Sequence, residues 1–441
     1  MQKVFITTLG CKVNQFESAA FKTGFEAAGL KIVSAQDTAD IVVINSCAVT
    51  GSAGAQSRKA IRRALRMHPH AEIIITGCYA EVGLNELINE VELTGRKYRL
   101  IGNNNKDKLV ATTLGRIDAS DDILPGTIRM ARDISRLPVK RFGERSRAYL
   151  RVQDGCESFC TYCIVPYTRG PSRSLPLGEV LEQARIFEEE GHREIVLTGI
   201  HLGNYGRDLP EQENIISLLD TLSTSTPEMA YRISSLEPME IDDTLLTLIQ
   251  TRDNIQPHLH IPLQSGNDDI LSRMGRRYTT RQFKKVIQRC IQYLPDGAIG
   301  IDILAGFPGE TEEQFNDCRT FLESLDFTYL HVFPYSIRPG TVAADFKDQV
   351  PGPIKERRVA ILRELSDRKK QHFYQSQLGR TLPVLVEGKR NNEGRLKGFT
   401  SNYISVQFDG PDSLLNSTTT VQLIDLGKDI VLAERTENHE N

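Results

Sequence analysis

Residues 149–163, YLRVQDGCESFCTYC, join a short apolar run typical of a β-strand to a loop that holds three of the chain's eight cysteines. The loop places Cys156, Cys160 and Cys163 with the spacing C-x3-C-x2-C. Three thiolates this close together can hold three irons of a 4Fe–4S cluster, and the fourth iron is then free to bind a small molecule. A zinc knot and incidental cysteines are the alternatives. Structural zinc commonly needs four ligands, and no fourth cysteine or histidine lies near this loop.

The region around this loop, residues 147–375, alternates short strands with helical patterns. Such alternation predicts a parallel sheet, and six units suit a partial (β/α) barrel because a closed barrel of eight units needs more chain. Strands are expected at Ala148–Gln153, Glu194–Thr198, Tyr231–Ser234, His258–Pro262, Gly300–Leu304 and Tyr329–Phe333. Helices are expected, for example, at Pro176–Glu190, Asp242–Thr251, Thr280–Tyr293 and Glu312–Leu325, and a charged helix at about Pro353–Gln375 closes the region.

Residues 1–115 show the same alternation and predict a doubly wound parallel α/β domain. Its strands are expected at Lys3–Thr8, Asp40–Asn45, Ala71–Thr76 and Arg99–Ile101, and its helices at about Gln15–Ala28, Ser52–Met67 and Leu84–Asn89. The linker or belt at 116–146 is first Asp-rich and then strongly basic. Residues 376–436 contain short alternating strands (LPVLVEG, YISVQF, TTVQLIDL and DIVLAE), which predict a small antiparallel β-barrel of a kind that often binds RNA.

A second set of three cysteines lies in the N-terminal region. Cys11, Cys47 and Cys78 each follow a short apolar strand, and the carboxyl ends of parallel strands meet at one edge of a sheet. The three thiols can therefore converge and hold a second cluster, although buried cysteines also serve as small core residues. Cys290 and Cys318 lie in helical patterns without a partner, and for them core packing is the better interpretation.

The central cysteine loop after the first strand of a (β/α) barrel resembles the radical S-adenosylmethionine (SAM) superfamily. That resemblance implies that Cys156, Cys160 and Cys163 hold a 4Fe–4S cluster whose open iron binds SAM, and that an electron from the cluster cleaves SAM to a 5′-deoxyadenosyl radical. By the same resemblance Tyr162 lies against the adenine of SAM. Further contacts to SAM are expected at carboxyl ends of the following strands, from Thr198, Gly199, Ser235, Glu237 and Gln264.

Two cysteine triplets together with a small C-terminal barrel resemble the methylthiotransferase family over nearly the whole chain. The resemblance implies an N-terminal three-cysteine domain, a radical SAM domain and a C-terminal TRAM domain. It also implies two 4Fe–4S clusters and replacement of a C–H bond by C–S–CH3. Branches of the family act on isopentenyladenosine in tRNA, on threonylcarbamoyladenosine in tRNA, or on an aspartate of a ribosomal protein. The segments Leu9–Gln15 (LGCKVNQ) and Asn45–Thr50 (NSCAVT) are most similar to the threonylcarbamoyladenosine branch.

Two basic segments are candidates for contact with RNA. The first runs from residue 58 to 66 and, on a helix, places Arg58, Arg62 and Arg66 in one row with Lys59 and Arg63 beside it. The second is a Gly-rich basic hairpin that carries Lys389, Arg390, Arg395 and Lys397. A solvated helix face and an ordinary hairpin loop are the alternatives. Together with the basic part of the belt, these segments favour RNA over a protein substrate.

Composition limits the remaining possibilities. The 441 residues carry a formal net charge of −3, so attraction to nucleic acid has to come from local patches. No apolar run is long enough to span a membrane, and the N-terminus lacks the features of a signal peptide, so we expect a cytoplasmic protein. We expect a monomer that methylthiolates carbon 2 of threonylcarbamoyladenosine beside the tRNA anticodon, with electrons from a flavodoxin- or ferredoxin-type protein. A different radical enzyme, or a non-catalytic iron–sulfur or zinc RNA-binding module, is the alternative.

Overall fold

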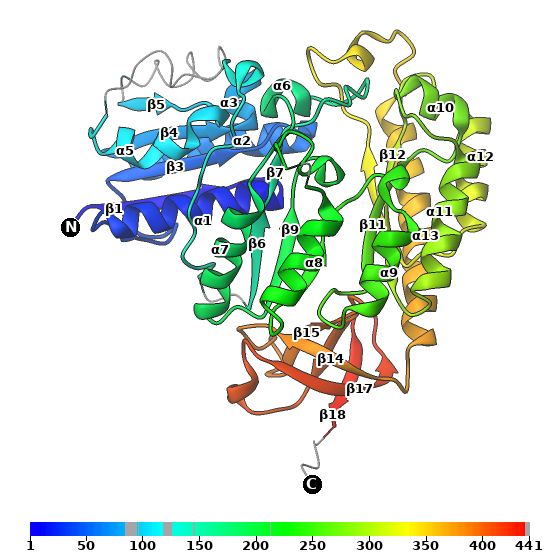
Figure 1. The fold of residues 1–441 in the computed structure, drawn as a ribbon. Coiled ribbons are helices and arrows are strands. Elements are labelled where there is room, and N and C mark those ends of the chain that lie inside the picture. The colour runs from blue at the N-terminus through cyan, green and yellow to red at the C-terminus, as the bar shows by residue number, and fades with distance from the viewer. Residues whose placement is uncertain (84–94, 96, 118–125, 144–145, 212, 437–441) are drawn as a thin grey trace.

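A computed structural model describes the chain except residues 84–94, 96, 118–125, 144–145, 212 and 437–441. Its N-terminal part is a five-stranded parallel sheet in the order β2-β1-β3-β4-β5 (Figure 1). The strands are β1 (Lys3–Thr8), β2 (Lys31–Ile32), β3 (Ile41–Ser46), β4 (Glu72–Gly77) and β5 (Tyr98–Leu100). The helices of this part are α1 (Lys12–Ala27), α2 (Gly51–Met67), α3 (Cys78–Val82) and α5 (Leu109–Thr113). The helix expected at 84–89 lies outside the described residues.

Both faces of this sheet are buried, which confirms the doubly wound arrangement. Val43 and Ile74 pack into the core that contains α1, whereas Val42, Ile73 and Ile75 pack into the core beneath α2. Successive side chains of a strand point to opposite faces, so a run of apolar residues supplies both cores.

The central part is the expected six-stranded parallel barrel. Its strands form two sheets in the orders β6-β9-β10 and β11-β12-β13, joined by bridges between Tyr231 and Ile255 and between Ser235 and His260. The strands are β6 (Arg147–Arg151), β9 (Glu194–Thr198), β10 (Ala230–Ile233), β11 (His258–Gln264), β12 (Ala298–Ala305) and β13 (Tyr329–Pro334). Two short strands, β7 (Gln153–Asp154) and β8 (Arg173–Ser174), pair beside the cysteine loop.

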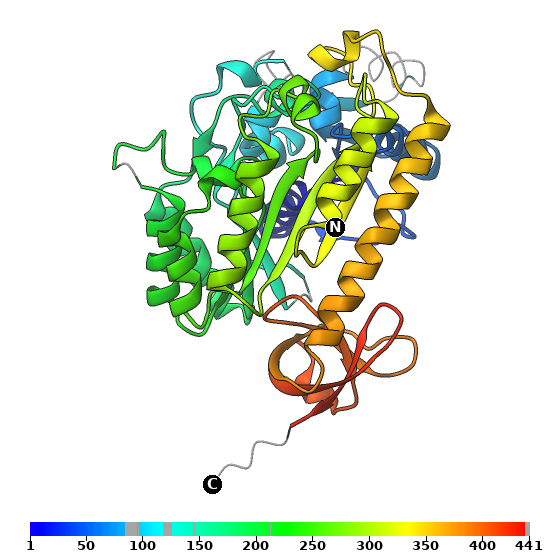
Figure 2. The same cartoon turned by 90° about the vertical axis from the view of Figure 1, so that its right-hand side faces the viewer.

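Helices cover the outside of this barrel. They are α7 (Leu177–Glu189), α8 (Ile215–Ser225), α9 (Asp243–Thr251), α10 (Asp268–Arg273), α11 (Thr280–Tyr293), α12 (Glu312–Glu323) and α13 (Gly352–Ser376), whereas the short α6 (Val165–Arg169) packs against α3 of the N-terminal part. Figure 2 shows the long α13 running from the barrel to the C-terminal part of the chain. There the Tyr374 side chain of α13 packs into the C-terminal core.

The C-terminal part is a closed five-stranded barrel, as its sequence pattern predicts. Its strands are β14 (Thr381–Val386), β15 (Leu396–Thr400), β16 (Ser405–Phe408), β17 (Thr418–Leu426) and β18 (Val431–Arg435). The sequence pattern missed β15, because this strand begins inside the polar, basic stretch interpreted as a hairpin loop. Only alternate residues of β15 are buried, and Lys397 points outward between Leu396 and Gly398.

The N-terminal sheet and the barrel share one hydrophobic core. The described part of segment 116–146 contributes Ile134, Leu137, Val139 and Phe142 to this core, so it packs between the two parts of the chain. Among the described residues, no helix is long and apolar enough to cross a membrane.

Candidate active site

The N-terminal cysteines converge at the carboxyl edge of the first sheet. Cys11 follows β1 and precedes α1, Cys47 follows β3, and Cys78 is the first residue of α3 after β4. These three strands are neighbours in the sheet. Gly10 lies so close to Cys47 that a β-carbon on Gly10 would stand 2.6 Å from the Cys47 sulfur. Burial raises the pKa of the Cys47 thiol to about 12, and the nearby Cys78 and Cys11 add to this rise.

A buried charge network ties this triplet to the barrel. Arg169 of α6 pairs with Glu17 of α1 at 2.5 Å and with Asp154 at 3.3 Å, and its Nε donates to the Cys78 sulfur at 3.3 Å. Lys106 pairs with the other oxygen of Glu17 at 2.5 Å, and the side chains of Arg169, Glu17 and Lys106 are almost wholly buried. Although burial alone would raise it, these cations hold the pKa of Glu17 far below its ordinary value. Arg151 also pairs with Glu17 and Asp154. The network therefore places three cations (Arg169, Lys106 and Arg151) and two carboxylates (Glu17 and Asp154) next to the N-terminal thiols.

The central cysteines lie on the loop between β7 and α6. Backbone hydrogen bonds from Cys156 to Gly170 (3.0 Å) and from Thr161 to Met274 (3.0 Å) hold this loop at the mouth of the barrel. Burial raises the pKa of Cys163 to about 12. The Cys156 sulfur lies 3.6 Å from His201 Nδ1. Burial alone would raise the pKa of the Cys156 thiol, but the contacts with His201 and Ser158 outweigh burial and lower it.

Cationic side chains flank the central thiols. The His201 ring also contacts the Glu240 carboxylate at 2.6 Å; burial opposes protonation, but the contacts with Cys156 and Glu240 raise the pKa of His201 to about 10. Arg276 donates to the Cys160 sulfur at 3.4 Å and pairs with Glu237. Positive charge beside thiols favours their thiolate form, which is the form that binds metal.

Both triplets fit a 4Fe–4S cluster. Each brings together three free thiols, the donor type that iron–sulfur clusters use. In the N-terminal triplet, Gly10 leaves open the space beside Cys47 that any side chain at that position would fill. In the central triplet, Cys160 opens onto a cavity of about 560 Å³, which leaves room for a ligand on a fourth iron.

The residues expected to contact SAM divide between two cavities. Thr198, Gly199 and Ser235 line a barrel cavity of about 330 Å³, whereas Glu237 lines the cavity beside Cys160. The Tyr162 ring packs edge-on against Phe307, in an apolar cluster below the loop. Gln264 ends β11 with a positive φ of 71° and lines neither of these cavities.

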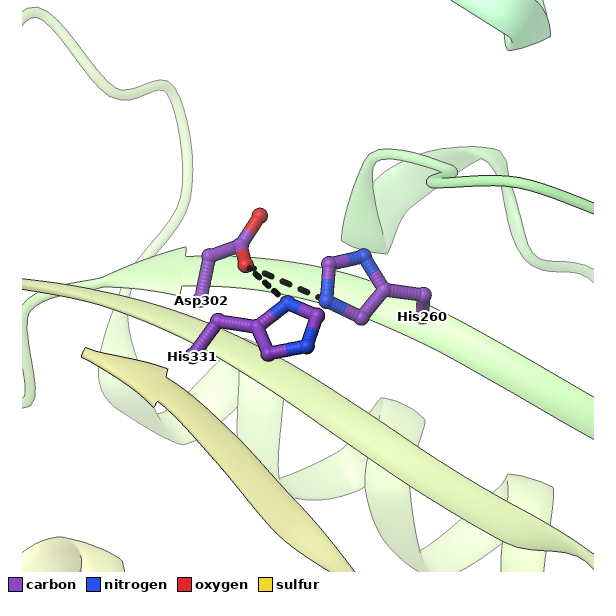
Figure 3. A group of neighbouring side chains, drawn as sticks. All are labelled: His260, Asp302 and His331. Carbon is purple, nitrogen blue, oxygen red and sulfur yellow. Dashed lines mark ion pairs between the residues drawn. The ribbon is translucent and has the colours of Figure 1, made fainter. Parts of the chain in front are cut away.

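The barrel cavity also contains a polar group that sequence reasoning did not single out (Figure 3). Asp302 of β12 lies 3.1 Å from His260 Nε2 and 3.3 Å from His331 Nδ1. The second ring nitrogen of His260 lies 2.6 Å from the Ser235 hydroxyl. Although burial alone would raise it, the two histidines hold the pKa of Asp302 well below its ordinary value, so its carboxylate is ionised. Cys11 lines the same cavity, which places the N-terminal triplet at its wall.

The basic residues expected to contact RNA occupy two surfaces. Arg58, Lys59, Arg62, Arg63 and Arg66 line a shallow hollow on α2, but Arg58 is half-buried and donates to the Tyr79 hydroxyl at 2.9 Å. Lys389 and Lys397 line a groove of about 870 Å³ between α1, the segment around 141–149 and the C-terminal barrel. Arg390 and Arg395 pair with Asp412 at 2.7 Å and with Asp409 at 4.0 Å, so both also tie the hairpin to neighbouring loops.

Comparisons with known proteins agree with this arrangement. A family model described as the radical SAM superfamily matches residues 150–322, and one described as uncharacterized protein family UPF0004 matches residues 3–94. Threonylcarbamoyladenosine tRNA methylthiotransferases MtaB of Aquifex aeolicus and Bacillus subtilis are each 38% identical to this chain. The alignments cover 92% and 97% of this chain and 97% and 95% of those proteins. The chain belongs to the methylthiotransferase family of radical SAM enzymes.

This methylthiotransferase is also similar to a member of another branch of the family and to a solved radical SAM enzyme. A tRNA-2-methylthio-N(6)-dimethylallyladenosine synthase of Fusobacterium nucleatum is 32% identical, over 96% of this chain and 97% of that protein. The radical SAM methyltransferase TsrM of Kitasatospora setae shares the fold, with a TM-score of 0.57 at 14% identity over 78% of this chain and 75% of that chain. As a member of its family, the methylthiotransferase uses SAM and two 4Fe–4S clusters.

Several site residues of the methylthiotransferase escaped sequence reasoning. His201 and Arg276 reach the central thiols from loops distant in sequence, and Arg169 reaches Cys78 from another part of the chain. The sequence offered a signal for the residues of the barrel cavity, but none for His201, Arg276 or Arg169. His258 and His260, like Tyr329 and His331, are polar residues two positions apart on otherwise apolar strands. Such a spacing indicates one shared face of a strand.

Proposed function

We propose that this enzyme methylthiolates carbon 2 of N6-threonylcarbamoyladenosine in tRNA, at the adenosine beside the anticodon. One observation carries the proposal: Cys11 of the N-terminal triplet lines the same barrel cavity as Thr198 and Gly199, which we expect to contact SAM. A base in this cavity lies beside Cys11 of the N-terminal triplet, while Cys160 of the central triplet lines the neighbouring cavity at the cysteine loop. The similarity to MtaB enzymes supports the choice of the threonylcarbamoyl substituent.

The chain's own residues supply the setting for this chemistry. Cys156, Cys160 and Cys163 hold the cluster that, with SAM, supplies a hydrogen-abstracting radical, and Cys11, Cys47 and Cys78 hold the cluster at which the methylthio sulfur is supplied. Arg276 and His201 place positive charge beside two of the central sulfurs. A base bound in the cavity would cover its lining and so limit the access of water, which protects a reactive species from side reactions.

The groove beside the barrel offers a path for the tRNA backbone. It is lined by Lys22, Arg141, Arg147, Lys389 and Lys397, with Glu387 as the one acid among its described lining residues. Arg147 and Tyr149 line both this groove and the barrel cavity. A backbone held by the cations of the groove can therefore place one unstacked base in the cavity, as enzymes that modify bases require.

The test of this function is mass spectrometry of nucleosides. A strain that lacks the gene should contain threonylcarbamoyladenosine without its methylthio derivative, and the cloned gene should restore the derivative. Methylthio product on isopentenyladenosine alone, or on a ribosomal protein, would assign the enzyme to another branch of the family. We also expect a flavodoxin- or ferredoxin-type protein to reduce the purified enzyme and the enzyme to elute as a monomer; neither outcome affects the choice of substrate.

A further inference from the structure

The barrel cavity is built from polar side chains that point inward from all six strands. Residues 11–13 close its open side, and Tyr403 of the C-terminal barrel closes one end. Its volume of about 330 Å³ lies at the lower end of the range of small-ligand pockets. Aromatic rings of Tyr149, Tyr329 and Phe333 also line it. The cavity therefore suits one flat base with a small polar substituent.

The charges around this cavity do not balance. Arg147 and Arg232 both pair with the single carboxylate of Glu194, Arg232 through two bonds of 3.0 Å. Asp302, the one acid among the described residues that line the cavity, contacts His260 and His331. Lys12 has no ion pair or hydrogen bond to another described side chain, although it lies within electrostatic range of Arg147, Arg232 and Asp302. One cation is thus left facing the cavity without an anion.

His331 of β13 lines the same cavity as Lys12. Its Nδ1 contacts Asp302, so the second ring nitrogen, Nε2, is directed away from that carboxylate (Figure 3). About half of the His331 side chain is exposed, at 52%, in contrast to 11% for His260. Because Asp302 orients the ring, His331 can offer Nε2 to a ligand without reorganisation.

We propose that Lys12 and His331 bind the carboxylate of the threonylcarbamoyl substituent in the barrel cavity, and that Lys12 determines which N6-modified adenosine is accepted. This inference rests on the proposed function and names the chemistry by which the substrate is selected. A carboxylate completes the charge balance that the cavity lacks. Lys12 is exposed, so an isopentenyl group bound in the cavity would cover its ammonium without offering an anion. A site built around a polar group rejects an analogue that lacks it.

The experiment measures equilibrium binding of four tRNA anticodon stem–loops to the iron-loaded enzyme. They differ only at the adenosine, which carries a threonylcarbamoyl group, its carboxylate methyl ester, an isopentenyl group or no modification. We expect the native enzyme to bind the free carboxylate about 10-fold or more tighter than the methyl ester, the effect of one charged hydrogen bond. Lys12→Met should lose most of this preference for the free carboxylate.

Two further variants make the test specific. Lys22→Met, also on α1 but in the groove, should weaken binding of all four stem–loops by the same factor, because it faces the backbone path. Lys12 is next to Cys11, so iron content is measured as well. His331→Gln repeats the comparison at the second proposed carboxylate contact, and we expect it to reduce the preference for the carboxylate.

The outcomes separate this inference from the proposed function. A full preference for the free carboxylate in both Lys12→Met and His331→Gln would overturn the carboxylate site. Equal weakening of all four stem–loops by Lys12→Met would also overturn it, because Lys12 would then hold a phosphate. By contrast, methylthio product formed by the native enzyme on isopentenyladenosine and not on threonylcarbamoyladenosine would overturn the proposed function itself.

Discussion

At the scale of single residues, Gly10 controls how closely the first strand approaches Cys47. Its φ of +89° lies in the left-handed region, and a β-carbon at this position would stand 2.6 Å from the Cys47 sulfur. Gly29 has a similar φ of +82°, but nothing lies within 4 Å of the place where its β-carbon would be. Both glycines therefore adopt a positive φ that a residue with a side chain rarely adopts. They differ in their surroundings, because only at Gly10 would a β-carbon collide with Cys47.

We therefore predict that Gly10→Ala lowers the iron content of anaerobically reconstituted protein from about eight toward about four atoms per chain, because the N-terminal triplet no longer holds a cluster. Gly29→Ala carries the same backbone strain, about 1–2 kcal/mol, and should retain all of its iron. Iron analysis of the two variants side by side checks this. Full iron in Gly10→Ala would show that the space beside Cys47 does not serve a cluster.

At the scale of elements, α2 has two different faces. Ile61 and Leu65 are buried against the first sheet, whereas Arg62 and Arg66 are exposed on the opposite side. Arg58 belongs to the same row but also contacts Tyr79, the residue next to Cys78. Like charges four positions apart on a helix are mildly destabilising, and an external polyanion offsets this repulsion. Arg62 and Arg66 are therefore the residues with which to test this surface, because both side chains are exposed.

We predict that Arg62→Ala combined with Arg66→Ala weakens tRNA binding roughly equally across sequences and reduces the slope of log affinity against log salt by about 1–2. Folding should survive, because both side chains are exposed. The matched control is Arg281→Ala with Lys285→Ala, two exposed residues with the same spacing on α11. Filter binding over a range of salt measures both variants. An unchanged affinity and slope in the α2 variant would assign the patch to a solvated helix face.

At the scale of the whole molecule, the two cysteine triplets lie beside two cavities of one barrel. Cys11 lines the barrel cavity, and Cys160 lines the cavity at the cysteine loop. Arg169 joins the N-terminal thiols to the barrel through buried ion pairs with Glu17 and Asp154. Breaking a buried pair by removing one partner costs about 3–5 kcal/mol, so these contacts hold the two parts of the chain in one orientation. The triplets therefore lie in a defined geometry although each is built by a different part of the chain.

We predict that replacing Cys11, Cys47 and Cys78 with Ala leaves formation of 5′-deoxyadenosine from SAM largely intact and abolishes methylthio product. Cleavage of SAM should need only the central triplet, because Cys160 opens onto a cavity with room for a ligand of the cluster that these cysteines would hold. Chromatography of SAM products and nucleoside mass spectrometry are run on the same preparation, with Cys290→Ala, a core cysteine, as the control.

Two results would contradict this division of labour. Loss of 5′-deoxyadenosine, with the central cluster confirmed by iron content and spectra, would show that the clusters act only together, through contacts such as that of Arg169 with Cys78. Methylthiolated tRNA from the triple variant would show that the N-terminal cysteines are not needed to supply sulfur.

Much of the architecture was predictable from local patterns. Alternating strands and helices placed both sheets, and β1, β9 and α11 have the expected bounds. The three N-terminal cysteines were expected to meet because parallel strands end at a common edge, and the structure brings them together there. Strand β15 was missed because its apolar residues are sparse and follow a basic turn. Cys290 and Cys318 are buried in the core, as their helical contexts predicted.

The sequence by itself determined the kind of fold, the two thiol triplets and the family. The alternation of strands and helices, the C-x3-C-x2-C spacing and the cysteine at the end of three parallel strands are all local features of the chain. Only the tertiary structure decided that Lys12 faces Arg232 and Asp302, that Arg169 contacts Cys78, and that His331 shares a cavity with Cys11. These contacts join residues from different domains of the chain. Their proximity follows from how the sheet packs against the barrel, and that packing depends on the shape of a shared apolar core rather than on any local pattern.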